Sequence, residues 1–69
     1  MMMIASENGY GVRLRDSERG WRVEIVDDAG AVVSERVCRD GSEARTFAST
    51  VRQHIYWLSA ERFREYYRI

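Results

Sequence analysis

Residues 10–15, YGVRLR, decide the fold, because apolar residues alternate in them with glycine and arginine. This period of two places the apolar side chains on one face of a β-strand and Arg13 and Arg15 on the other. A polar turn at 16–20 follows, and residues 21–25, WRVEI, alternate in the same way. The two segments therefore predict an antiparallel hairpin with one apolar face.

A third strand is predicted at residues 31–38, after the turn signal DDAG at 27–30. Its β-branched residues favour a strand, but its alternation is imperfect, because Val33 and Val37 share a face with a glutamate between them. A β-bulge or a position at the edge of the sheet would explain this pattern. Residues 10–38 thus predict a three-stranded antiparallel β-meander.

The rest of the chain predicts a long helix at residues 42–68, in which apolar side chains recur at helical spacing without an intervening glycine or proline. Asp40 and Ser42 are alternative N-caps for it, and Ser59 could cap a second, shorter helix. We therefore expect one α+β domain over 1–69, with the helix, continuous or kinked near Ser59, packed on one face of the sheet.

A comparison of lengths points to a partner. A continuous helix over 42–68 would measure about 40 Å at 1.5 Å per residue, whereas strands of this size span about 20–23 Å. The distal half carries five large apolar residues that form the candidate interface: Trp57, Leu58, Phe63, Tyr66 and Tyr67. Either the chain kinks near Ser59 and folds back, or two copies pair through their helices, as the small size favours. We expect a homodimer or another protein partner.

Charge argues against a general polyanion binder, because 11 basic residues balance 11 acidic residues. The solvent face of the sheet nevertheless carries Arg13, Arg15 and Arg22, which could contact a nucleic-acid backbone. Binding of nucleic acid through these arginines is therefore the alternative to a protein-interaction role. In the helix, Glu61 and Glu65 lie among the arginines at pairing distance and weaken the case for such binding there.

No group of residues in the sequence predicts a catalytic or metal-binding site. His54 and Cys38 are the single histidine and cysteine, too few for a structural zinc site and without a spaced catalytic partner. The acidic pair Asp27-Asp28 lacks the spacing of a calcium loop. We therefore expect no enzyme activity, metal or cofactor. One cysteine, no apolar run of membrane-spanning length and no signal-like start predict a cytoplasmic protein without a disulfide.

Part of the sequence resembles a known family. Arg45-Thr46-Phe47 precedes Trp57-Leu58, and the stretch 21–58 resembles the arm-type DNA-binding domains of tyrosine recombinases. Those domains are three-stranded sheets followed by a helix, so the resemblance implies the same fold and a DNA-binding role. In that family the Arg-x-Phe run lies in a strand, whereas here it fits a helix, and no functional residue is transferred. As a whole, the chain resembles short uncharacterised bacterial domains of unknown function.

Overall fold

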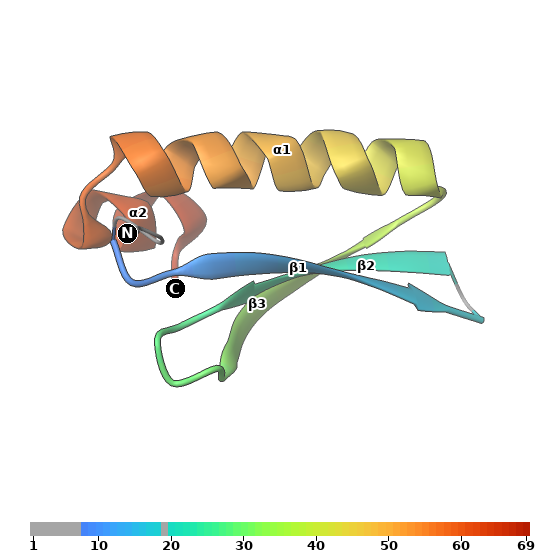
Figure 1. The fold of residues 1–69 in the computed structure, drawn as a ribbon, viewed down its shortest axis with the longest axis horizontal. Coiled ribbons are helices and arrows are strands. Elements are labelled where there is room, and N and C mark those ends of the chain that lie inside the picture. The colour runs from blue at the N-terminus through green and yellow to red at the C-terminus, as the bar shows by residue number, and fades with distance from the viewer. Residues whose placement is uncertain (1–7, 19) are drawn as a thin grey trace, which may run out of the picture.

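The fold is a three-stranded antiparallel sheet followed by two helices (Figure 1). It is seen in a computed structural model that describes residues 8–18 and 20–69. The elements are β1 (Gly11–Ser17), β2 (Gly20–Val26), β3 (Val32–Cys38), α1 (Gly41–Trp57) and α2 (Ala60–Tyr67). The strands lie in the order β1-β2-β3, so the predicted meander and α+β class are confirmed.

Residues 1–9 were expected to be loosely ordered, and most of them lie outside the described ranges. Asn8, at the end of that segment, donates a hydrogen bond from Nδ2 to the carbonyl oxygen of Leu58 at 3.1 Å. Its own Oδ1 accepts from the backbone N–H of Tyr10 at 3.1 Å. Asn8 therefore ties the entry into β1 to the C-terminal end of α1.

The first half of α1 lies close to the sheet because its inward side chains are small. Ala44 and Ala48 are buried against Val23 of β2 and Cys38 of β3. At the start of the helix, Gly41 lies against the ring of Trp21, and a Cβ there would be 3.2 Å from its Cε2 atom. Glycine and alanine at these positions allow close packing of helix on sheet.

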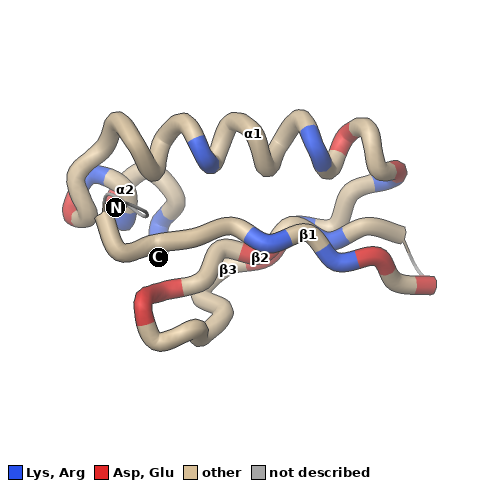
Figure 2. The backbone as a smooth tube through the Cα atoms, in the orientation of Figure 1, with Lys and Arg blue, Asp and Glu red and all other residues tan. Residues whose placement is uncertain are grey.

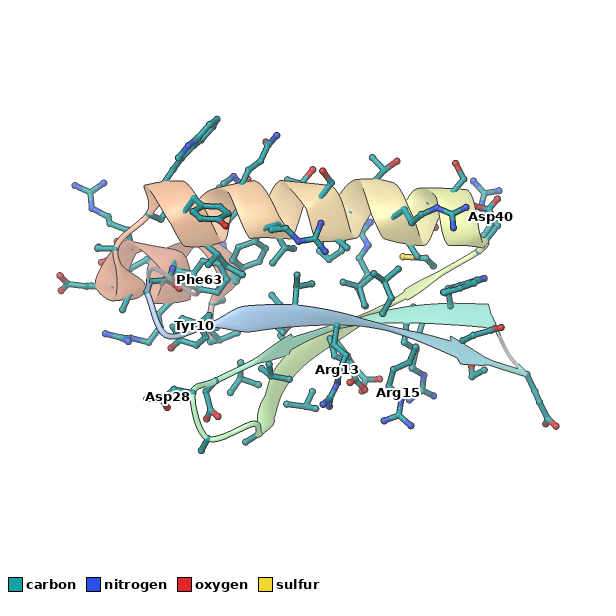
Figure 3. The ribbon with its side chains drawn as sticks, in the orientation of Figure 1. Tyr10, Arg13, Arg15, Asp28, Asp40 and Phe63 are labelled. Atoms are coloured by element: carbon teal, nitrogen blue, oxygen red, sulfur yellow. The ribbon has the colours of Figure 1, made fainter. Side chains whose placement is uncertain are left out.

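The second half of α1 packs on the sheet together with α2, which fills part of the space between them. Val51 and Ile55 of α1 form a buried cluster with Ile25 of β2 and Phe63 of α2. Phe63 is fully buried, and its ring stacks on that of Tyr10 with centroids 4.7 Å apart. Figures 1 and 3 show α2 lying beneath the C-terminal end of α1, with Phe63 pointing between the helices and the sheet.

A kink at Leu58 and Ser59 divides the predicted long helix in two, so the helix does not extend beyond the sheet as a continuous helix would. Leu58 leaves the helical conformation at φ −102° and ψ 141°, and Ser59 then caps α2 by accepting from the N–H of Arg62 at 3.2 Å. The predicted second cap is confirmed, and the chain takes the folded-back arrangement. The expectation that Phe63 is exposed for a partner is corrected, because the fold-back places its side chain in the core of its own chain.

Capping also sets the start of α1. The side chain of Asp40 accepts from the N–H of Glu43 at 2.8 Å, so Asp40 is the N-cap, rather than Ser42. In return Glu43 accepts from the backbone N–H of Arg39 at 2.8 Å. The first bond satisfies one of the N–H groups that the first turn of a helix leaves without a partner, and the second fixes the residue before the cap.

The irregular third strand is explained by both predicted features. β3 lies at the edge of the sheet, and its register against β2 shifts between Ile25 and Val26, which pair with Ser34 and Val32. The shift leaves Val33 as the extra residue of a bulge. Because α1 packs mainly over β1 and β2, the valines of β3 stay exposed: Val32, Val33 and Val37.

Truncation of Phe63 is the direct test of this core. We expect Phe63→Ala to lower the free energy of unfolding by about 3–5 kcal/mol, because it removes a buried ring and leaves a cavity. The exposed Tyr56→Ala is the matched control and should change the free energy by less than about 0.5 kcal/mol. Urea denaturation followed by circular dichroism measures both, and equal midpoints would contradict the packing described here.

Candidate functional site

Exposed aromatic side chains gather where α1 ends and α2 packs beneath it. Trp57 is 76% exposed and Tyr66 is 62% exposed, although burial of an aromatic ring is normally favourable. His54 lies one helical turn before Trp57 in α1, and its ring centroid is 4.4 Å from that of Tyr66. We call His54, Trp57, Leu58 and Tyr66 the aromatic corner.

Tyr67 holds the corner rigid from below. Its hydroxyl lies 2.6 Å from Nδ1 of His54, and the two groups share a hydrogen bond between α1 and α2. The ring of Tyr67 also meets the ring of Tyr66 edge to face at 4.9 Å and that of Phe63 at 4.8 Å. Tyr66 therefore packs against His54 and Tyr67, and such contacts restrict its rotamers and lower the entropy that binding would cost.

The surface beside the corner carries both signs of charge. Leu58 and Tyr66 line a shallow depression of about 240 Å³ together with Arg62 and Glu65. Arg62 and Glu65 are exposed, so the depression has an apolar floor and a polar rim with one cation and one anion. Aromatic residues and arginine at the centre and polar groups at the rim are typical of protein interfaces.

Sequence reasoning found this site in part. Of the five residues expected at an interface, Trp57 and Tyr66 are exposed and Leu58 is half-buried beside them. Phe63 and Tyr67 instead pack inward against the core. His54 was not assigned to the site, and its part depends on contacts with residues of α2 that periodicity along α1 does not reveal.

The arginines of the open sheet face are paired with glutamates. Figure 3 shows Arg13 and Arg15 pointing away from α1, and both reach Glu24, at 2.9 Å and 3.7 Å. Arg22 lies 3.3 Å from Glu35. Three cations therefore face two anions, and Figure 2 shows both signs interspersed along this part of the sheet.

Glu24 is 4% exposed although it lies on the open face of the sheet. It occupies the central strand, directly opposite Arg13 on β1 and Glu35 on β3. Arg13 and Arg15 both contact the Glu24 carboxylate. Their guanidinium groups replace the water that this carboxylate loses on burial. The sequence placed Glu24 on this face but did not show its burial.

A larger groove of about 430 Å³ runs beside α1 and β3, lined by Arg36, Asp40, Phe47 and neighbouring polar residues. Its charged groups already have roles in the fold. The Arg36 guanidinium stacks over the Phe47 ring at 4.7 Å, and Asp40 caps α1. Glu43, the third charged residue of the lining, accepts from the backbone N–H of Arg39, so all three charged side chains of the groove already have partners within the fold.

Other polar residues singled out by the sequence have structural roles. Cys38 is buried in the core. Asp27 accepts from the backbone N–H groups of Ala29 and Ala31 at 3.0 Å and 2.9 Å, which shapes the turn between β2 and β3. Within residues 8–18 and 20–69, no cluster of three or more His, Cys, Asp or Glu could hold a metal ion. In the same residues no helix has the length and apolar character needed to cross a bilayer.

Comparison with known proteins adds no relative. No protein-family model matches the sequence, and neither the curated proteins nor the solved structures give a match. Arg45, Thr46 and Phe47 lie in α1, so the run that resembles the recombinase domains is helical in this chain.

Tyr67, which packs beneath the aromatic corner, has a raised pKa that a pH titration can detect. Burial, and to a smaller extent the negative charge of an ionised Tyr66, together raise the pKa of Tyr67 from 10.0 to about 12. We expect absorbance at 295 nm to show one tyrosine ionising at about 12 in the folded protein. Because folding raises this pKa, its contribution to stability is complete below pH 10 and is lost between pH 10 and 12.

Tyr67→Phe should remove that step, whereas Tyr66→Phe should retain it at a slightly lower pH. Circular dichroism recorded in parallel distinguishes ionisation of the folded protein from unfolding. An unchanged final step in Tyr67→Phe would assign the high pKa to another residue.

Proposed function

We propose that this protein is a self-associating interaction domain whose contact surface is the aromatic corner. The observation that carries the proposal is the exposure of two large aromatic rings, Trp57 at the end of α1 and Tyr66 on α2, the second packed against His54 and Tyr67. Exposed tryptophan and tyrosine on a rigid support form the centre of many protein interfaces. Apolar side chains that the fold leaves uncovered gain stability when a partner covers them.

The rim of the corner favours a second copy as the partner. A two-fold axis brings the same surface of both copies together, so that Arg62 of one copy faces Glu65 of the other. The rim thus supplies its own complementary charge, and the net charge of zero leaves two copies without overall repulsion. A chain of 69 residues also buries a small core, which an interface would extend.

The open sheet face supports nucleic-acid binding less well. Its three arginines are held in ion pairs with Glu24 and Glu35, so a phosphate would have to compete for them. One excess positive charge on this face supplies few of the phosphate contacts that drive such binding.

Light scattering over micromolar to millimolar concentrations tests self-association. We expect a mass that rises with concentration toward twice 8.1 kDa. Trp57→Ser and Tyr66→Ser should each weaken dimerisation at least about tenfold, the effect of removing an interface residue worth more than about 1.4 kcal/mol. Circular dichroism of each variant confirms that the fold is retained, as expected for exposed side chains.

Tyr56→Ser is the matched control, because Tyr56 is 60% exposed but neighbours Trp57 in the helix and so points about 100° away from it. It should dimerise as the unmodified protein does. A monomeric mass at all concentrations would refute the proposal. Retarded migration of DNA or RNA at low salt, lost in Arg13→Ala with Arg15→Ala, would favour the sheet face instead.

A further inference from the structure

The connection between α1 and α2 has features of a hinge. It consists of Leu58 and Ser59, which both adopt extended backbone conformations between two helices. Residues 42–69 contain no glycine or proline, so no residue in the connection forbids helix. Flanking i→i−4 bonds are already present, from the N–H of Leu58 to His54 and from that of Phe63 to Ser59.

Within the hinge residues themselves, two side-chain hydrogen bonds hold the bend. The Ser59 side chain accepts from the N–H of Arg62 at 3.2 Å, and the Leu58 carbonyl accepts from Asn8 at 3.1 Å. In a continuous helix the Leu58 carbonyl would accept from the N–H of Arg62 instead, and the N–H groups of 59–61 would also gain helical partners. The hinge itself is held by the Ser59 cap and the Asn8 bond, whereas the position of α2 depends on the burial of Phe63 and on the hydrogen bond between Tyr67 and His54.

Straightening the hinge would vacate a specific site. Phe63 would leave a pocket formed by Tyr10, Ile25, Val51 and Ile55 and become exposed to water. The segment that fits this pocket is α2 itself, which also supplies the Tyr67 hydroxyl for the hydrogen bond to His54. A second copy of the chain offers the same α2 with the same contacts.

We propose that α2 is exchangeable between two copies, with residues 58–59 becoming helical and Phe63 of each chain filling the pocket of the other. Two pockets and two α2 segments make a closed two-fold dimer, in which the core contacts that Phe63 makes in the monomer are formed between the two chains. This goes beyond the contact through the aromatic corner, because it depends on the hinge and on Phe63 rather than on the exposed ring of Trp57.

Two substitutions shift the hinge in opposite directions. Ser59→Ala removes the N-cap and introduces a strong helix former, so it favours the straight form. Ala60→Pro keeps the cap and opposes the straight form, because proline is accepted in the first turn of a helix but not in its interior. Ser59, at φ −63° and ψ 166°, already has the backbone conformation that a residue before proline prefers.

The experiment refolds the full chain from denaturant at micromolar to millimolar concentration and measures mass by light scattering, in a Trp57→Ser background that removes the corner contact. We expect Ser59→Ala to raise the dimer-to-monomer ratio at least about fivefold, the change that loss of one N-cap brings. Ala60→Pro should remain monomeric. After dilution, the Ser59→Ala dimer should dissociate slowly, because Phe63 must leave its pocket in both chains.

Equal dimer content in Ser59→Ala, Ala60→Pro and the unmodified hinge would overturn the proposal. Rapid dissociation of the Ser59→Ala dimer would also overturn it, because that would indicate a surface contact. In the chain with Trp57 intact, Ala60→Pro should still dimerise through the corner. Failure of that contact alone would refute the proposed function and leave the exchange of α2 standing.

Discussion

The burial of Phe63 beneath the second half of α1 is the contact on which the rest of the structure depends. The small residues Ala44 and Ala48 bring the first half of the helix directly onto the sheet. Farther along, Val51 and Ile55 share their cluster with a side chain from α2, so the core closes when the chain bends back at Ser59. In a chain of this length, a buried aromatic ring is a large share of the apolar area that offsets conformational entropy.

The same bend creates the surface to which we assign the function. Trp57, at the end of α1, stays exposed among the described residues, while folding α2 beneath α1 brings Tyr66 against His54. Tyr67 joins both features, because its ring packs on Phe63 and its hydroxyl bonds to His54. Core and aromatic corner are therefore coupled, and the inferred exchange of α2 would rebuild both from two chains.

The open face of the sheet shows how pairing changes the meaning of a charge pattern. In the sequence of β1, Arg13 and Arg15 form a positively charged stripe that could bind a phosphate backbone. Antiparallel register places Glu24 opposite Arg13, and both arginines turn toward this one carboxylate. The resulting cluster stabilises the central strand on the face that no helix covers, which is a structural role for residues that composition alone leaves open.

Local patterns in the sequence determined the strands, their order along the chain, the helical C-terminal half and the cap at Ser59, because periodicity and capping depend on residues a few positions apart. Tertiary structure decided which aromatic residues are covered, since the direction of the chain after Ser59 sends Phe63 inward and leaves Trp57 outside. It also paired His54 with Tyr67, 13 positions away, and buried Glu24 between arginines of the neighbouring strand. These contacts join separate elements, and no period along one element specifies them.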